Sequence, residues 1–218
     1  MKTVLITGGN GDIAQAIARQ LEAAGWRVQA PGRDQLDVAS PESVAQYVRE
    51  HGAPDVLINN AGYNVPQGIA AADPAVQQKI LDICLFGVFN CTNSILRVNP
   101  AAKIINIGST AYARPNGPWS AYCAAKAGVV MATACWAKDG VDAICISPGK
   151  TLTKMRKVLH TTPEDPDTLM KPDDFAAVVV RAMEKPCAVG THLVVTSENV
   201  RDVLQSLYST EEGACPCL

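Results

Sequence analysis

A tyrosine and a lysine stand four residues apart in the stretch W-S-A-Y-C-A-A-K, residues 119–126. On a helix, this spacing places Tyr122 and Lys126 on the same face, one turn apart. A free tyrosine has a pKa of about 10, and a neighbouring ammonium favours the phenolate and lowers that pKa. Tyr122 could then exchange a proton with a carbonyl or alcohol oxygen as a general acid or base. For this spacing alone, a surface Tyr–Lys pair is the competing interpretation.

A serine precedes the pair at the end of an apolar run. Ser109 lies in N-I-G-S-T, residues 106–110, and a loop followed by one helical turn could bring its hydroxyl to that of Tyr122. Ser109 would then hold and polarise the substrate oxygen, as one donor of an oxyanion hole does. The three residues together predict a proton-transfer site.

Short apolar runs alternate with longer alanine-rich stretches along the chain. Runs rich in β-branched residues predict strands over Thr3–Thr7, Arg27–Ala30, Val56–Asn59, Lys103–Ile107, Ala143–Ser147 and His192–Thr196. Stretches of helical period predict helices near 12–24, 41–51, 74–97, 119–138, 172–184 and 199–208. Because the strands are almost wholly apolar, we expect a doubly wound α/β fold, with a parallel sheet covered by helices on both faces. Ligands bind such sheets beyond the carboxyl ends of the strands.

Composition limits the function classes. The chain has 218 residues and a formal net charge of −2, which gives no global attraction to nucleic acid or to anionic membranes. The first apolar run is too short for a signal peptide, and no later stretch is expected to span a bilayer. Eight cysteines without metal-ligand or disulfide-framework spacing predict reduced thiols in a cytoplasmic protein with no metal site. We expect one domain over 1–208, with a substrate loop at about 150–171 and a flexible tail at 209–218.

The first strand is followed by a glycine-rich turn that opens a helix. In T-G-G-N-G-D-I-A, residues 7–14, Gly8 and Gly11 allow a tight turn and a close approach to a pyrophosphate, whose charge would lie on the helix N-terminus. Ala14 is small enough to let the helix pack on the strand. A plain β–α turn is the competing interpretation for this motif by itself.

The second strand is followed by P-G-R. Folds selective for NAD usually place a carboxylate here, on the ribose hydroxyls. This chain has Gly32 and Arg33, and an arginine at that place can bind a 2′-phosphate. NADP(H) is therefore favoured, while the nearby Asp34 leaves NAD(H) open.

A short connection follows Arg33. Leu36-Asp37-Val38 begins only three positions after Arg33, which is too close for the helix of a parallel crossover. We therefore expect a rudimentary or absent third strand. Asp37 and Val38 would then form the wall of an adenine site, with Asp37 accepting from the adenine amino group.

The later strand ends carry small and polar residues. The N-N-A-G run at 59–62 places Asn60, Ala61 and Gly62 where side-chain amides could tie strands together or contact a ribose. The last such end, S-P-G-K-T-L-T at 147–153, forces a turn and offers the hydroxyls of Thr151 and Thr153.

The ordered set of these motifs resembles the short-chain dehydrogenase/reductase family, from Thr3 to about Thr196. The resemblance implies an NAD(P)-binding Rossmann fold, with Tyr122 as general acid/base, Ser109 on the substrate oxygen and Lys126 on the nicotinamide ribose. The residues then assigned to the cofactor are Thr7, Gly8, Gly9, Asn10, Gly11, Asp12, Ile13, Arg33, Asp37, Val38, Asn60, Ala61, Gly62, Tyr122, Lys126, Pro148, Gly149, Thr151 and Thr153.

One departure from the family pattern bears on the activity. The fourth catalytic residue of the family is an asparagine, and here C-L-F-G-V-F places Cys84 at that position. A thiol is a poor substitute for an amide that orients a proton relay. Three functions therefore stay open: an NADP(H)-dependent reductase or dehydrogenase of a small polar substrate, a sugar-nucleotide reductase or epimerase, and a catalytically weakened NAD(P)-binding regulatory protein.

Apolar residues on two helices predict self-association. The predicted 119–138 helix carries Val129, Val130, Ala132, Thr133 and Trp136, and the helix before it carries Phe86, Phe89, Cys91 and Ile95. About half of these residues must pack on the sheet. The rest, together with the resemblance, indicate a homodimer or homotetramer built through these two helices.

Overall fold

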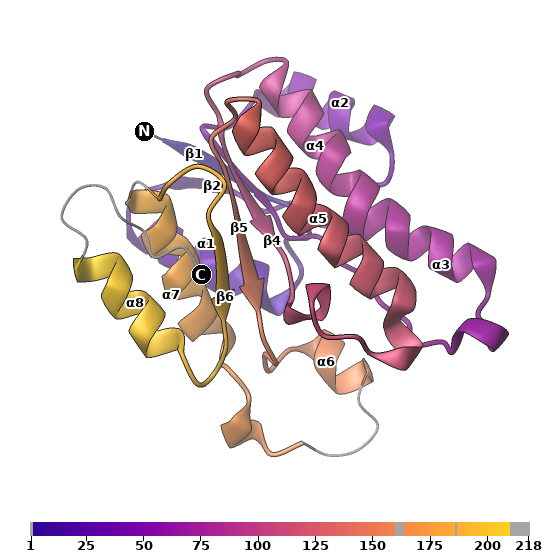
Figure 1. Cartoon of the computed structure of the whole chain (residues 1–218). Helices are drawn as coiled ribbons and strands as arrows, with labels where there is room; N and C mark the ends of the chain where they lie inside the picture. The colour runs from indigo at the N-terminus through magenta and orange to yellow at the C-terminus, as the bar shows by residue number, and fades with distance from the viewer. Residues whose placement is uncertain (1, 160–163, 186, 210–218) are drawn as a thin grey trace.

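The computed structural model describes the chain from residue 2 to residue 209, except for 160–163 and 186. Six parallel strands form one sheet: β1 (Thr3–Ile6), β2 (Arg27–Gln29), β3 (Val56–Asn59), β4 (Lys103–Ile107), β5 (Ala143–Pro148) and β6 (His192–Val195). The order across the sheet is β2-β1-β3-β4-β5-β6 (Figure 1). The strands are added to one side of β1 and then to the other, so the topological switch point lies between β1 and β3. The predicted strands and the doubly wound α/β fold are confirmed.

Alternating side chains give the sheet two buried faces. In β1, Val4 and Ile6 belong to one hydrophobic cluster and Leu5 belongs to the other. Helices α1 (Asp12–Ala23) and α7 (Pro172–Glu184) cover the first face, and α8 (Val200–Ser209) packs on α7. Helices α2 (Pro41–His51), α4 (Gly87–Leu96) and α5 (Ser120–Lys138) cover the second (Figure 1). The apolar runs of the sequence therefore face helices on both sides, as parallel strands require.

The long helix expected near 74–97 is interrupted. It consists of α3 (Pro74–Leu81), a π-helical segment η2 (Asp82–Phe86) and α4. The span from Pro74 to Leu96 has the length and hydropathy of a membrane span, which differs from the sequence-based expectation. Cys91 and Ile95 of this span are fully buried against the sheet, as in a core helix. Segments of π-helix often occur at functional sites, and this one holds Cys84.

No strand forms between β2 and α2, where the usual Rossmann fold has its third strand, as the short connection predicts. Between Gln29 and Pro41, all of it described, the chain makes only turns. Gly32 accepts hydrogen bonds from the N–H groups of Gln35 and Leu36, and Ser40 caps α2 by accepting from Ser43. The sheet therefore ends at β2.

Short helices surround the carboxyl ends of the strands. They are the 3-10 turns η1 (Ile69–Ala71), η3 (Thr110–Tyr112), η4 (Gly117–Trp119) and η5 (Pro166–Thr168), and the helix α6 (Lys154–Leu159). The predicted substrate loop contains α6 and η5. Of the predicted tail, 209–218, the residues from 210 onward lie outside the described part of the chain.

Candidate active site

A cleft of about 360 Å³ lies beyond the carboxyl ends of the central strands. We call it the main cleft. It is lined by Gly8, Asn10, Gly11, Asp12, Ile13, Arg33, Leu36, Asp37, Val38, Asn60, Ala61, Gly62, Tyr63, Lys79, Ile83, Ile107, Gly108, Tyr122, Lys126, Pro148, Thr153, Lys154 and Met155. Its place at the topological switch point is where open α/β sheets bind ligands.

The glycine-rich turn at the end of β1 requires glycine at two positions. Gly8 has a φ of 69°, in the left-handed region that side chains disfavour. A Cβ on Gly9 would overlap the carbonyl oxygen of Ala30. The turn therefore lies close to β2, and Gly8 leaves one wall of the main cleft without a side chain. This fits the close backbone approach that a pyrophosphate needs.

Thr7 supports the neighbouring wall rather than contacting the cleft. Its Oγ1 accepts hydrogen bonds from the N–H groups of Asn60 and Ala61, both at 3.0 Å, and Asn60 Nδ2 donates to the Thr7 carbonyl oxygen. These bonds hold the N-N-A-G loop against the glycine-rich turn. The other asparagine, Asn59, is buried and donates to Thr92 and Asn106, so it ties β3 to β4 and α4.

Arg33 and Asp37 are paired with each other. Arg33 Nε and one terminal nitrogen each lie 3.2 Å from Asp37 Oδ2, and Asp37 Oδ1 accepts from the N–H of Ala39. The guanidinium is largely exposed and lines the cleft. A 2′-phosphate would therefore compete with Asp37 for Arg33.

Tyr122 and Lys126 lie in the cleft one turn apart on α5. The Lys126 side chain is buried, and its Nζ donates to the Ile107 carbonyl oxygen at 2.7 Å. Nζ lies 5.8 Å from the centre of the Tyr122 ring. Burial lowers the pKa of Lys126, while the neighbouring Cys84 and Cys145 raise it. An ammonium has three donors, so two N–H groups of Lys126 are left for a bound group.

The pKa of Tyr122 departs from the sequence-based expectation. Burial raises this pKa well above its ordinary value, Cys84 and Cys123 raise it further, and a hydrogen bond with the Ser109 side chain acts in the opposite direction. The expected lowering by the Lys126 ammonium is not among the effects on this pKa, and desolvation of the phenolate dominates. Tyr122 is therefore a neutral phenol at neutral pH, which is the form that donates a proton.

Cys84 forms two hydrogen bonds with the backbone of Tyr63. Its thiol donates to the Tyr63 carbonyl oxygen at 3.2 Å and accepts from the Tyr63 N–H at 3.3 Å. An amide side chain could form the same pair of bonds. Burial raises the pKa of the Cys84 thiol, which makes it a poor nucleophile. Cys84 therefore holds the loop after N-N-A-G, and Tyr63 of that loop lines the cleft.

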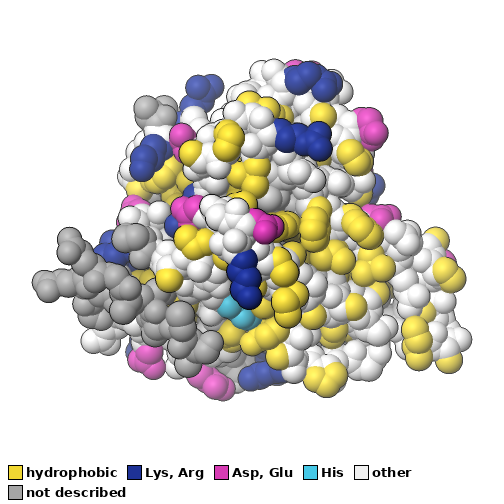
Figure 2. Space-filling view, turned by 45° about the horizontal axis from the view of Figure 1, so that its top comes forward, with side chains coloured by type: hydrophobic (Ala, Val, Ile, Leu, Met, Phe, Trp, Pro, Cys, Tyr) yellow, Lys and Arg dark blue, Asp and Glu magenta, His cyan; other side chains and the backbone are white. Residues whose placement is uncertain are grey.

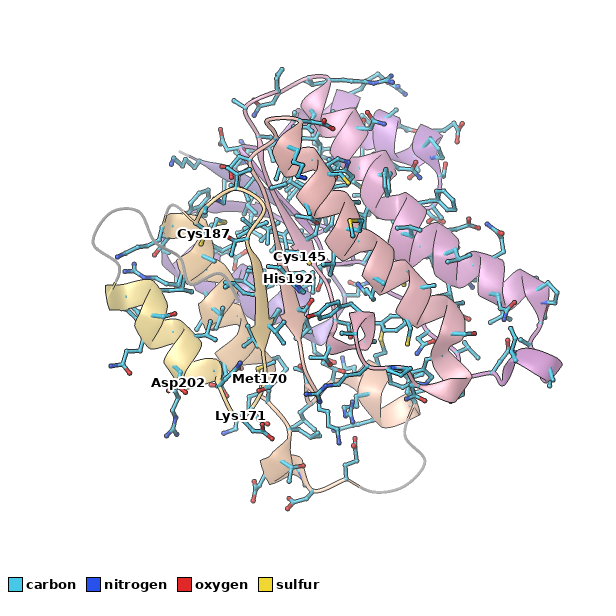
Figure 3. All side chains as sticks on the ribbon, viewed as in Figure 1. Cys145, Met170, Lys171, Cys187, His192 and Asp202 are labelled. Atoms are coloured by element: carbon cyan, nitrogen blue, oxygen red, sulfur yellow. The ribbon has the colours of Figure 1, made fainter. Side chains whose placement is uncertain are left out.

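A histidine supports the turn that carries Ser109. His192 Nε2 lies 2.8 Å from Ser147 Oγ, and the His192 ring meets the Tyr112 ring edge to face at 4.7 Å. Figure 3 shows His192 beside Cys145, its register partner on β5. Because Tyr112 ends the 3-10 turn that Ser109 begins, this contact fixes the position of the turn.

Helix α6 closes one side of the main cleft. Its first backbone N–H, that of Lys154, donates to Asp12 Oδ2 at 2.6 Å, so α6 is tied to the start of α1. The end of the Met155 side chain approaches Gly62 across the cleft. Arg156 forms two hydrogen bonds with Glu164 and therefore faces a carboxylate of its own chain.

The structure brings most of the predicted residues together, but not all. Five of them do not line the main cleft: Thr7, Gly9, Ser109, Gly149 and Thr151. Thr151 is buried and donates to the Gly149 carbonyl oxygen, so both belong to the turn after β5. The sequence reasoning missed Leu36, Tyr63, Lys79, Ile83 and Met155. Lys79 and Ile83 stand four residues apart in a predicted helix, and this spacing indicates that they share one helix face.

Comparison with known proteins agrees with this geometry. A family model described as short chain dehydrogenase matches residues 34–164. The acetoacetyl-CoA reductase of Shinella zoogloeoides is 30% identical over 217 residues, covering 82% of this chain and 89% of that protein. The L-fucose dehydrogenase of Bos taurus is 28% identical, covering 89% of this chain and 88% of that one.

A solved structure shows the same fold. The alcohol dehydrogenase from Thermococcus sibiricus, complexed with 5-hydroxy-NADP, superposes with a TM-score of 0.78 at 21% identity, covering 90% of this chain and 97% of that one. Together, the matched family model and the reductase relative show that the chain belongs to the short-chain dehydrogenase family, as an oxidoreductase that acts on CH–OH or C=O groups with NAD(P).

Proposed function

We propose that the chain is an NADP(H)-dependent reductase or dehydrogenase of a small polar substrate, with Tyr122 as its general acid/base. The observation that carries the proposal is the joint position of Tyr122 and Lys126 on one wall of the main cleft, one turn apart on α5. The Ser109 side chain acts on the same group, since it lowers the pKa of Tyr122. The side-chain-free cradle at Gly8 and the tight turn at Gly9 fit a dinucleotide phosphate. A bound nicotinamide would supply or accept the hydride.

The residues of this chain would divide the remaining work. Ser109 holds the substrate oxygen, and Tyr122 gives that oxygen its proton during reduction or takes it back during oxidation. Lys126 keeps one N–H on Ile107 and turns the others toward the cofactor ribose. The raised pKa of Tyr122 favours reduction at neutral pH, because the phenol is already protonated.

One feature favours a sugar-nucleotide reductase as a second candidate. No strand forms between β2 and α2, and a short connection at this place favours such an enzyme. A weakened regulatory protein is the third candidate, suggested by Cys84. Both hydrogen bonds of Cys84 to Tyr63 support the first proposal over this one, because they preserve the architecture of the cleft.

A nucleotide and substrate screen tests the proposed function. The purified protein is titrated with NADPH and NADH, and NADPH absorbance is then followed with a panel of small ketones, aldehydes, 3-oxoacyl thioesters and nucleotide-linked keto-sugars. We expect saturable NADPH oxidation with a small polar carbonyl compound. Oxidation only with the keto-sugars would establish the second candidate. Tight binding of nucleotide without turnover on any compound would establish the third.

Cofactor preference gives a prediction at Arg33. Replacing Arg33 with alanine should weaken NADPH binding by about 1–3 kcal/mol, because a charge-assisted contact with the 2′-phosphate is lost. NADH binding should change little. Lys154→Ala is the matched control, since Lys154 also lines the cleft as an exposed cation. Isothermal titration with both nucleotides measures the effect. Equal losses for NADPH and NADH would show that Arg33 does not contact the phosphate.

We also propose self-association through α5, α4 and the adjoining end of η2. As predicted for about half of the nine residues named on these helices, five are buried: Cys91, Ile95, Val129, Ala132 and Thr133. Phe86 is 51% exposed and Phe89 is 38% exposed, and Phe89 meets Trp136 of α5 edge to face at 5.1 Å. Val130 and Trp136 are partly buried residues that pack against the same hydrophobic cluster, and Met131 is exposed. Figure 2 shows hydrophobic side chains gathered on this face.

A homodimer is the smallest assembly expected. Exposed aromatic residues on a flat pair of helices suit a twofold interface in which the same surface meets its copy. Light scattering at micromolar concentration should report at least twice the chain mass of 23.0 kDa. Phe86→Asp should reduce that value, and Ile69→Asp, at an exposed apolar residue outside the two helices, should not. A 23 kDa species for the unmodified chain would refute the assembly.

A further inference from the structure

A second and much smaller cavity lies against Tyr122. Its volume is about 10 Å³, close to what one water molecule needs. Its walls come from the loop at 64–67, from Gln77 and Ile80 of α3, and from the residues at 118–122 that lead into α5. Tyr122 lines this cavity as well as the main cleft, so what occupies the small cavity acts on the position of Tyr122.

The small cavity is lined by a buried amide that has no partner. Asn64 is only 7% exposed, and neither its Nδ2 nor its Oδ1 has a hydrogen-bond partner among the described residues. Native proteins rarely leave both ends of a buried carboxamide unpaired, because each end loses its hydration on burial. Asn64 therefore calls for a partner small enough for this cavity.

The start of α5 supplies backbone donors beside the same cavity. The first N–H groups of a helix have no partner within the helix. Trp119, which precedes the first residue of α5, caps none of them with its side chain. Residues of the first turn, Ser120, Ala121 and Tyr122, line the small cavity. Donors from α5 and a carboxamide from the opposite loop thus border the same space.

We propose that the small cavity binds one ordered water molecule between Asn64 and the first turn of α5. The water accepts a hydrogen bond from a backbone N–H of that turn and donates one to Asn64 Oδ1. A small space with polar partners on two sides is where ordered water is found, and the volume of about 10 Å³ is suited to one water molecule. Its catalytic consequence rests on the proposed function of Tyr122.

The water would make Asn64 a positioning residue for Tyr122. Tyr122 is the third residue of α5, so the placement of the first turn sets the position of its hydroxyl in the main cleft. The loop of Asn64 is already joined to the turn before α5, since the Gln67 N–H donates to the Pro118 carbonyl oxygen at 2.8 Å. The bridging water extends this connection from η4 into the helix.

The Asn64→Leu substitution tests whether the small cavity holds water or is dry. If the water is present, leucine removes its carboxamide partner, and we expect a lower unfolding temperature and a several-fold loss of kcat with an unchanged KM for NADPH. Asn64→Asp keeps an acceptor oxygen and should restore most of kcat. If the cavity is dry, leucine replaces an unpaired amide with an apolar group of similar shape. The protein would then unfold at a higher temperature with kcat unchanged, and the proposal would fail.

Asn99→Leu is the matched control. Asn99 is partly buried and donates to the Pro54 carbonyl oxygen at 2.9 Å, and it lines neither the main cleft nor the small cavity. The Asn99→Leu variant should have a lower unfolding temperature and an unchanged kcat. It therefore separates the effect of lost stability from the effect of a misplaced Tyr122. A loss of kcat equal to that of Asn64→Leu would overturn the positioning role.

A measurement without substrate tests the water itself. We expect a rotating-frame Overhauser cross-peak between the Asn64 carboxamide protons and a long-lived water, in the full chain without nucleotide. The cross-peak should be absent in Asn64→Leu. If the assigned carboxamide shows no such cross-peak, the water proposal is wrong whatever the enzyme activity. If the cross-peak is present in a chain that reduces no carbonyl compound, only the proposed function fails.

Discussion

Replacing Tyr122 with phenylalanine is expected to remove most carbonyl reduction while leaving the fold and the affinity for nucleotide nearly unchanged. The substitution deletes only the hydroxyl that would donate the proton, and general acid catalysis contributes about 10²–10⁴-fold to a rate. The ring remains to pack against Trp119, whose centre lies 5.9 Å away edge to face. Turnover of the substrate found in the screen, measured under saturating NADPH, gives the result.

Tyr112→Phe is the control for the loss of a tyrosine hydroxyl. Tyr112 contacts His192 through its ring, so its hydroxyl is not needed for that contact. This variant should keep most of its activity. If Tyr122→Phe reduced the substrate as fast as the unmodified chain, Tyr122 would not be the acid.

The rates of reduction and oxidation should depend differently on pH if Tyr122 is the general acid/base. The pKa of Tyr122 is raised by burial, so the neutral phenol persists above the pH at which a free tyrosine ionises. Reduction uses this neutral form, and its rate should stay level through the neutral range. Oxidation needs the phenolate, and its rate should still be rising at alkaline pH. A fall in the reduction rate near neutral pH that is lost in Tyr122→Phe would contradict this assignment.

Replacing Lys126 with alanine should damage both turnover and nucleotide affinity. Its ammonium is expected to hold the cofactor ribose while it donates to Ile107, and hydrogen bonds of charged groups contribute about 1.5–3 kcal/mol each. The measurements are titration with NADPH and turnover of the substrate. We therefore expect a loss of at least tenfold in affinity, at about 1.4 kcal/mol per factor of ten.

Lys126→Met keeps the volume of the buried chain and shows whether a cavity alone explains the loss. It should be as impaired as Lys126→Ala. Lys103→Ala removes another partly buried lysine, one that pairs with Asp142 outside the cleft, and should leave nucleotide affinity unchanged. A Lys126→Met protein with normal affinity and turnover would remove Lys126 from the site.

The sequence predicted the fold well because the strands are short and apolar on both faces. Every predicted strand lies within one or two residues of its observed bounds, and the absence of a strand between β2 and α2 follows from the short connection between Arg33 and Leu36. Chain length between elements limits topology more strongly than propensity does, since a crossover helix cannot fit into so short a connection.

Parts of the site could not be predicted from residue types. A Tyr–Lys spacing shows that the two side chains share a helix face, but not that desolvation dominates the pKa of Tyr122. Periodicity could not show that Asp37 pairs with Arg33, or that Cys84 bonds the backbone of Tyr63. These contacts depend on side-chain directions at turns and on the π-helical segment. Asn64 was missed for the same reason, because burial of a loop residue is decided by the elements around it.

The lost third strand also has a consequence for aggregation. A sheet that ends in a long open strand offers unpaired backbone groups to the edges of other chains. Here the edge strand β2 has only three residues, Arg27–Gln29, with a charged residue at its start. Pro31 follows shortly after and has no N–H to donate. The shortened chain therefore ends its sheet at an edge too short and too interrupted to recruit a strand from a neighbouring molecule, so the compact fold should cost little in solubility.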